Sequence, residues 1–190
     1  MPIAKAARLT LLAAVLAVPT APVFAGSLSG VNLPDKVDVK GQSLVLNGLG
    51  LRKRFVVKVY VGGLYLPQKN KDAQKILGGD TPHRMVMHFL YGVSKDQMCD
   101  AFNEGLEANT PKAGPEVKKG FATLCGWMEA IDKGKELVLT YVPGEGTHVE
   151  VNGKSKGTIP GAATGDAVLA TWIGPKPGPG GDFKNGVLGN

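Results

Sequence analysis

Aromatic residues, cysteines and long hydrophobic runs are all scarce in this sequence. The aromatic side chains make up 6% of the chain and are not interleaved with the basic ones, so the pattern does not indicate a nucleic-acid site. Neither of the two cysteines belongs to a CxxC pair or a metal-spaced cluster, and we expect no metal and no cofactor. After residue 25, no apolar segment approaches the about 20 residues that a membrane-spanning helix needs, so we expect no stable membrane span.

The size and charge of the chain fit one ordinary globular domain. The first 25 residues hold two of the 22 basic residues and none of the 16 acidic residues, which leaves residues 26–190 with a net charge of 20 − 16 = +4. This mild charge is typical of a solvated basic surface. The ~165 residues from 26 to 190 are within the usual size of one domain, and they show no internal repeat. We therefore predict a single domain over residues 26–190.

The first 25 residues have the pattern of a signal peptide. Lys5 and Arg8 give a positive start, Leu9–Val18 is a short apolar run, and small residues stand at the positions that precede a cleavage site after Ala25. The apolar run is short for a membrane span, although an uncleaved anchor is the alternative. We predict that residues 1–25 are removed and that the mature protein is exported, to the periplasm if the cell is Gram-negative.

The stretch from residue 46 to residue 66, LNGLGLRKRFVVKVYVGGLYL, is rich in β-branched and aromatic residues. It predicts a central strand that is covered on both faces, or by the core on one face and by a ligand on the other. Asn47-Gly48 is a strong hairpin signal, so we expect a turn there and a second arm over Phe55–Tyr65. The double glycine at Gly62-Gly63 indicates a bulge, or a place where another segment approaches the backbone closely.

Two guanidinium groups, those of Arg52 and Arg54, stand where the expected turn leads into this strand. A guanidinium at the mouth of an apolar surface is a natural anchor for a carboxylate or an oxyanion. The alternative is an ordinary surface arginine beside a core strand.

The rest of the domain is divided into blocks of strands and helices. Ser94 and Gln97 form a capping box, which predicts a helix to about Ala108, and a second helix begins near Pro115 with an apolar face that extends to Ile131. The other expected elements are a strand over 84–90, an antiparallel meander over 136–159 and a helix over 164–173, followed by a Gly-rich tail. Consecutive hairpins beside a helix pair predict an α+β fold, a large antiparallel sheet with helices packed on one face.

Two pairs of reactive side chains need an interpretation. Cys99 and Cys125 lie beside the apolar faces of the two neighbouring helices, so they are candidates for a disulfide in an oxidising compartment, or else two small core residues that never meet. His83 and His88 are five residues apart, which matches neither one strand face nor one helix face. We interpret both histidines as structural.

Three stretches of the sequence resemble the chalcone isomerase fold family. They are GLGLR at 48–52, VKVYVGGLYL at 57–66 and AVLATWIG at 167–174, which are similar to the family's Gly-x-Gly-x-Arg turn, its V-K-x-x-x-x-G-x-Y-L strand and its A-V-L-x-T-x-I-G helix. The likeness is to the exported bacterial chalcone isomerase-like proteins. It implies an open-faced sandwich in which a ligand cleft lies between the sheet and the helices.

The resemblance also implies roles for individual residues. Arg52 matches the turn arginine, which holds a developing negative charge in the isomerases and a carboxylate in the family's fatty-acid-binding branch. Tyr60 stands where that branch keeps its tyrosine and the isomerases keep a threonine, and Thr171 matches a helix hydroxyl of the isomerases. Val93 and Asp100 stand near the positions of an isomerase tyrosine and asparagine, and a carboxylate there would disfavour an anion.

Three functions follow from the resemblance as hypotheses. The first is binding of a fatty-acid-like or other amphiphilic anion by Arg52, Tyr60 and Thr171, with Arg54 as the alternative anchor because the linker after the turn is shorter than in the plant enzymes. The second is an isomerase or intramolecular lyase that cyclises a chalcone-like phenolic enone, with Arg52 and Thr171 as catalytic residues. The third is a non-catalytic interaction module of the cell envelope with a collapsed cleft.

Overall fold

The protein is described by a computed structural model, and the description applies to residues 24–190, so the predicted signal peptide lies almost entirely outside the described residues. Its centre is an antiparallel sheet with the strand order β3-β4-β5-β6-β7-β8-β9, and β1 and β2 pair as a separate hairpin. The strands are β1 (Phe24–Leu28), β2 (Val31–Pro34), β3 (Lys36–Val39), β4 (Gln42–Arg54), β5 (Val57–Leu66), β6 (His83–Phe89), β7 (Glu136–Val142), β8 (Gly146–Val151) and β9 (Lys154–Ile159). The helices are α1 (Ala73–Leu77), α2 (Lys95–Asn109), α3 (Pro115–Trp127), α4 (Ala162–Ile173) and α5 (Gly181–Val187).

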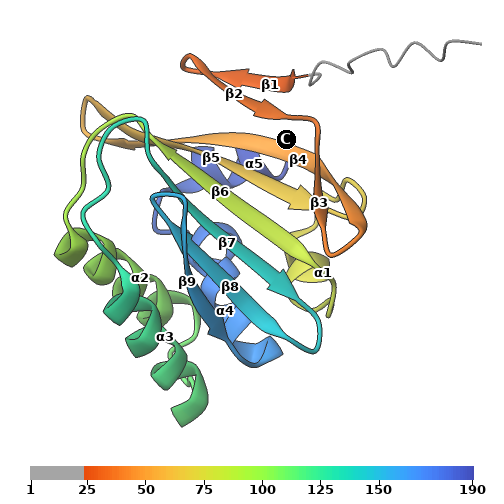
Figure 1. Ribbon diagram of the computed structural model, residues 1–190, viewed down its shortest axis with the longest axis vertical. Helices are drawn as coiled ribbons and strands as arrows, with labels where there is room; N and C mark the ends of the chain where they lie inside the picture. The colour runs from red at the N-terminus through yellow and green to blue at the C-terminus, as the bar shows by residue number, and fades with distance from the viewer. Residues whose placement is uncertain (1–23) are drawn as a thin grey trace, which may run out of the picture.

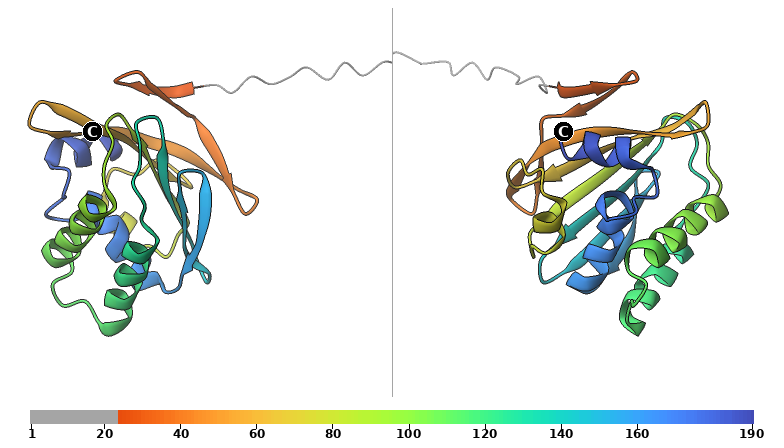
Figure 2. Two further views of the ribbon diagram at one scale, coloured as in Figure 1. Left: turned by 60° about the vertical axis from the view of Figure 1, so that its left-hand side comes forward. Right: turned by 180° about the vertical axis from the view of Figure 1, so that it is seen from behind.

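The two faces of the sheet are covered differently (Figure 1). Helices α4 and α5 lie on one face with α2 and α3 beside them, as the view from behind shows (Figure 2). The main apolar core lies between this face and the helices, where alternate residues of β5 and β6 such as Leu64, Met87 and Phe89 are buried. A smaller core on the opposite face joins β2 to β4, β5 and β6. The predicted α+β fold with helices on one face is confirmed, and the β1–β2 hairpin covers part of the other face.

The hairpin expected at Asn47-Gly48 is wrong. Strand β4 runs through these residues with a register irregularity, and the chain reverses instead between Arg54 and Val57, which face each other across β4 and β5. Asn47 is buried and uses its side chain in place of a turn: its amide nitrogen donates to the carbonyl oxygens of Asn70 (3.0 Å) and Val187 (2.8 Å). Tertiary hydrogen bonds therefore override the local turn preference of Asn-Gly.

The double glycine of β5 marks a close approach rather than a bulge. A Cβ on Gly62 would stand 2.4 Å from the Phe183 ring of α5, so the missing side chain lets α5 pack directly on the sheet. The bulge of β5 lies nearer its start: Arg52 faces Tyr60 and Lys53 faces Lys58, which leaves Val59 as the extra residue. Bulges change the direction of nearby side chains, and this one lies beside the pocket described below.

The helices follow the sequence pattern closely. Helix α2 has the predicted capping box, in which the Ser94 hydroxyl accepts from the Gln97 backbone and the Gln97 side chain accepts from the Ser94 backbone. Helix α3 ends at Trp127, so the apolar face expected to extend to Ile131 is completed by an isolated bridge between Ile131 and Val93. Within residues 24–190, no helix is both long and apolar enough to cross a membrane.

Candidate ligand pocket

A cavity of about 290 Å³ opens between the helices and the end of the sheet where β4 turns into β5. Its size is near the lower limit of ordinary small-molecule sites. Apolar side chains make most of its wall, and they come from the β5 bulge, β6, α2 and α4. The lining residues are Arg52, Arg54, Phe55, Val57, Val59, Tyr60, Met87, Phe89, Tyr91, Gly92, Val93, Gln97, Met98, Ala101, Phe102, Glu104, Thr171, Trp172, Gly178 and Pro179.

The structure brings together the four residues that the sequence singled out for ligand binding. Arg52, Arg54, Tyr60 and Thr171 all line this cavity, although they come from β4, β5 and α4. Their shared location agrees with an anion-binding pocket, and their roles in binding stay predictions.

The two arginines occupy different depths of the pocket. Arg52 is half-buried and lies directly opposite Tyr60 across β4 and β5, so their side chains share the helical face of the sheet. Arg54 is exposed, beside the turn. Within the described range, neither guanidinium forms an ion pair or a side-chain hydrogen bond. Arg52 is therefore the better placed of the two to meet a ligand inside the cavity.

Tyr60 presents a hydrogen-bond donor that has no use in the fold. Its hydroxyl oxygen accepts a hydrogen bond from Trp172 Nε1 at 3.1 Å, and its ring is packed against Phe89 and Phe183. Burial raises the pKa of Tyr60 to about 12, although the Trp172 hydrogen bond and the charge of Arg52 act in the opposite direction. The hydroxyl is thus protonated at neutral pH, and no acceptor for its proton occurs among residues 24–190.

The Thr171 hydroxyl is less available than the sequence resemblance implies. It donates to the carbonyl oxygen of Val168 in its own helix at 2.8 Å, as threonines often do inside helices. Its methyl side contacts α2 where Gly105 leaves room: a Cβ on Gly105 would stand 2.7 Å from Thr171 Cγ2. Thr171 therefore joins α4 to α2, and its hydroxyl keeps only acceptor capacity toward the pocket.

Helix α2 supplies a different polar residue from the one expected. Val93 lines the pocket, but the exposed Asp100 does not, so the predicted anion-repelling carboxylate at Asp100 is wrong. Asp100 lies on a solvent-exposed position of α2. The carboxylate that does line the pocket is that of Glu104, one turn further along and exposed.

Trp172 is the functional residue that sequence reasoning missed. Its indole N–H fixes the Tyr60 oxygen, and its ring makes an edge-to-face contact with Phe102 of α2. The sequence signal was its place next to Thr171 in the AVLATWIG motif. Trp172 contributes an apolar ring to the lining and a hydrogen bond to Tyr60, and neither feature gives a charge or spacing pattern in the sequence.

The remaining candidates lie away from the pocket. Cys99 and Cys125 are free thiols on α2 and α3, and Cys99 Sγ lies 3.5 Å from the carbonyl oxygen of Cys125. Their pairing stays a prediction, which mass measurement with and without reductant would check. His83 is buried against Tyr141, and His88 lies 3.0 Å from Glu136. The described part of the chain holds no group of side chains that would bind a metal ion.

Comparison with known proteins gives the family. A family model described as chalcone isomerase-like matches residues 25–189, so the chain belongs to the chalcone isomerase-like family. Among solved structures, it is similar to the fatty-acid binding protein AtFAP1 of Arabidopsis thaliana, with a TM-score of 0.66 and 18% sequence identity over 84% of this chain and 92% of that chain. At this identity the likeness shows a shared fold. No curated protein sequence matches the chain.

Proposed function

We propose that this protein binds a fatty acid or a similar amphiphilic anion in the pocket, with Arg52 as the anchor for its acidic head group. The observation that carries the proposal is a half-buried guanidinium that forms no ion pair with residues 24–190. It lies beside a tyrosine proton without an acceptor in the same range, at a mostly apolar cavity whose one lining carboxylate, that of Glu104, is exposed. The fatty-acid binding of the Arabidopsis protein of the same fold supports this choice of ligand. We also propose that binding takes place after export, because residues 1–25 have the pattern of a cleaved signal.

The free energy of binding would have two sources. A charge-assisted hydrogen bond to Arg52 contributes about 1.5–3 kcal/mol. Burial of the hydrocarbon against side chains such as Phe89, Met98 and Phe102 contributes about 0.8 kcal/mol for each methylene, before the cost of ordering the ligand. Tyr60 would orient the head group, since its proton is free and its oxygen is fixed by Trp172.

The test is titration of the delipidated protein with a fluorescent fatty acid and with the matching fatty alcohol. We expect Arg52→Gln to weaken fatty-acid binding roughly 10- to 150-fold, the equivalent of the charge-assisted bond. Arg54→Gln is the matched control, because it removes the same group from the exposed rim of the same pocket and should weaken binding much less. The alcohol lacks the carboxylate, so its affinity should be the same in wild type and Arg52→Gln. Equal fatty-acid affinity in wild type and Arg52→Gln would disprove the anchor.

The other two hypotheses fit the site less well. An isomerase would use the Thr171 hydroxyl to orient its substrate, and that hydroxyl donates within α4. A collapsed cleft does not agree with a cavity of about 290 Å³. Loss of chalcone absorbance in the presence of wild-type protein, beyond the rate in buffer, would revive the enzymatic hypothesis.

A further inference from the structure

The turn between β4 and β5 carries the two most exposed large hydrophobic side chains among residues 24–190. Phe55 is 92% exposed and Val56 is 94% exposed, and they are the two residues that connect the paired Arg54 and Val57. Single apolar residues on a surface need no explanation, but two large ones together at the tip of a hairpin indicate a binding function. The tip projects beyond the sheet at the end that holds the pocket (Figure 1).

The backbone at this tip is not what turn chemistry favours. Phe55 has a φ of +54°, a left-handed conformation that costs a bulky side chain of order 1–2 kcal/mol and that glycine adopts freely. Two-residue hairpins of this kind favour glycine at the first position. A phenylalanine that is both strained and fully exposed stabilises neither the turn nor the core, so its benefit must come from something outside the chain.

The charges around the tip indicate which kind of partner it binds. Arg52, Lys53 and Arg54 precede the two apolar residues and Lys58 follows them, while residues 39–71 contain no acidic side chain. None of the four basic groups forms an ion pair with any residue from 24 to 190. Apolar side chains inserted among acyl chains, surrounded by Lys and Arg at the depth of the phosphates, are the arrangement by which proteins bind an anionic lipid surface.

The tip is also the rim of the pocket. Phe55, Val57 and Arg54 line the cavity mouth together with Tyr91, an aromatic side chain that is 59% exposed. Tyr91 is tied to β5 by a hydrogen bond from its backbone N–H to the Val59 carbonyl oxygen at 3.2 Å. Tyrosines are common at the interface between membrane and water, and this one borders the same opening.

We propose that the β4–β5 tip docks this protein on an anionic lipid bilayer, with Phe55 and Val56 inserted and Lys53, Arg54 and Lys58 facing the phosphate groups. In this orientation the pocket opens at the bilayer surface, so an amphiphile would move between bilayer and pocket without crossing water. The docking depends only on the tip. The exchange of ligand rests on the proposed function.

The first test measures docking without any added ligand. Delipidated protein is sedimented with vesicles of phosphatidylcholine alone and with vesicles that contain phosphatidylglycerol, at low and at high salt. We expect binding to the anionic vesicles that weakens as salt increases, and little binding to the neutral ones. Equal binding to both vesicles, or no binding to either, would overturn the proposal.

Variants of the tip identify the surface. Phe55→Gly/Val56→Ser removes the apolar groups and puts glycine where the backbone favours it, so the fold should be kept while vesicle binding falls at least tenfold. Phe55→Leu keeps the apolar character and should keep binding. Unchanged binding in Phe55→Gly/Val56→Ser would overturn the proposal, as would a wild-type dimer in sedimentation velocity that this variant dissociates, because the tip would then be a contact between copies of the chain.

Charge variants separate docking from ligand binding. Lys53 and Lys58 lie outside the pocket lining, so Lys53→Gln/Lys58→Gln should keep its fatty-acid affinity in solution. Each basic residue near an anionic surface contributes about fivefold in binding, and we expect this variant to bind anionic vesicles at least tenfold more weakly. The control is Lys118→Gln/Lys119→Gln on α3, which has the same net charge and exposed positions and should bind like wild type. Equal vesicle binding by the two charge variants would overturn the role of the tip, whether or not Arg52→Gln confirms the ligand site.

Discussion

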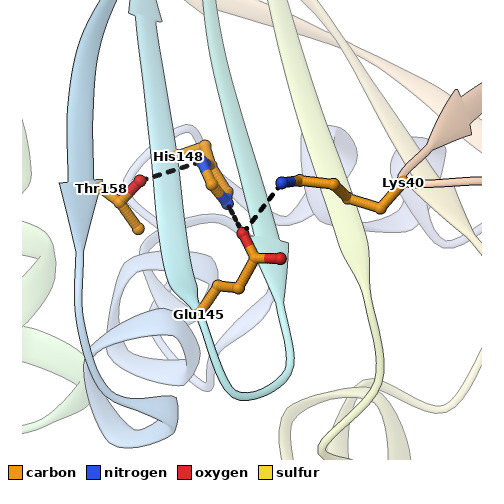
Figure 3. A network of polar contacts seen from close by, with 4 residues as sticks. All are labelled: Lys40, Glu145, His148 and Thr158. Atoms are coloured by element: carbon orange, nitrogen blue, oxygen red, sulfur yellow. Dashed lines mark hydrogen bonds and ion pairs between the residues drawn. The ribbon is translucent and has the colours of Figure 1, made fainter.

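Positive charge lies near both ends of strand β4, but it has partners within the protein at one end only. In the β3–β4 turn, just before the strand begins, Lys40 lies 3.3 Å from Glu145. Glu145 also contacts His148 Nε2 at 2.9 Å, and His148 Nδ1 lies 2.9 Å from the Thr158 hydroxyl (Figure 3). At the other end, Arg52 and Arg54 line a mostly apolar cavity, and neither forms an ion pair with any described residue.

Under the proposed function, this difference separates charges that complete the fold from charges that bind a ligand. The Lys40 network joins the β3–β4 turn to the β7–β8 turn and to β9, and each of its polar groups has a partner within the protein. A charge that has such partners gains nothing more from an incoming anion. Arg52 is half-buried beside a Tyr60 proton that has no acceptor among residues 24–190, so in the proposed complex an anion would accept two hydrogen bonds there.

The largest effect is expected from reversing the charge at the pocket end. In Arg52→Glu, the new carboxylate repels a fatty acid and also accepts a hydrogen bond from the Tyr60 hydroxyl. The ligand therefore loses its contacts with both residue 52 and Tyr60. We expect fatty-acid affinity to fall more than 100-fold, beyond the loss in Arg52→Gln, and an alkylammonium ion to bind instead. Titration with both amphiphiles is the measurement. Lys40→Glu is the control, since it reverses a positive charge in the β3–β4 turn, where Lys40 pairs with Glu145. It should leave both affinities as in wild type.

The next largest effect is expected from Tyr60→Phe, which acts on the ligand and on the fold together. Loss of the hydroxyl removes a donor to the head group, for an expected loss of roughly tenfold in affinity. It also leaves the buried Trp172 N–H without its acceptor, which should lower the free energy of unfolding by about 1–3 kcal/mol. Ligand titration and urea denaturation measure the two effects.

A second tyrosine provides the control for this variant. Tyr141 is also buried and donates to Asp80 at 2.5 Å, away from the cavity lining. Tyr141→Phe should leave fatty-acid affinity unchanged. If the two tyrosine variants lost affinity equally, the effect would come from general destabilisation, and the distinction between the two ends of β4 would lose its support.

The pocket end was predicted from sequence better than the strand that carries it. Arg52 and Tyr60 were chosen from a motif, and they share a face because alternate residues of paired strands do so. The turn at Asn47-Gly48 failed because Asn47 makes long-range hydrogen bonds to Asn70 and Val187, which local propensity does not contain. The true turn has Phe55 at a positive φ, where hairpin turns favour glycine. Such violations are expected where a segment is selected for function.

The pH dependence of binding gives a smaller and more specific test. Burial raises the pKa of Tyr60 to about 12, so this donor stays protonated through the neutral and moderately alkaline range. A carboxylate ligand loses its charge only below about pH 4 to 5. We therefore expect constant affinity between pH 6 and 9 and a decline below pH 5 for a fatty acid, with no decline for the fatty alcohol. A transition between pH 6 and 9 would assign the recognition to a different group.

The smallest effect is expected from Glu145→Gln, which disrupts the Lys40 network near the start of β4, and it should appear in stability alone. Lys40 first, and then His148, holds the pKa of Glu145 below its ordinary value of 4.5. A carboxylate with a lowered pKa in the folded state stabilises the protein above its unfolded pKa, and the contribution is lost as the pH falls through the folded pKa. Wild type should therefore melt slightly above Glu145→Gln at pH 7, and the difference should shrink to zero on acidification below about pH 4.5. Because Glu145 is exposed, salt should reduce the difference.

Fatty-acid affinity at pH 7 should be equal in the two proteins, and a loss in Glu145→Gln would mean that the two ends of the strand are coupled rather than separate.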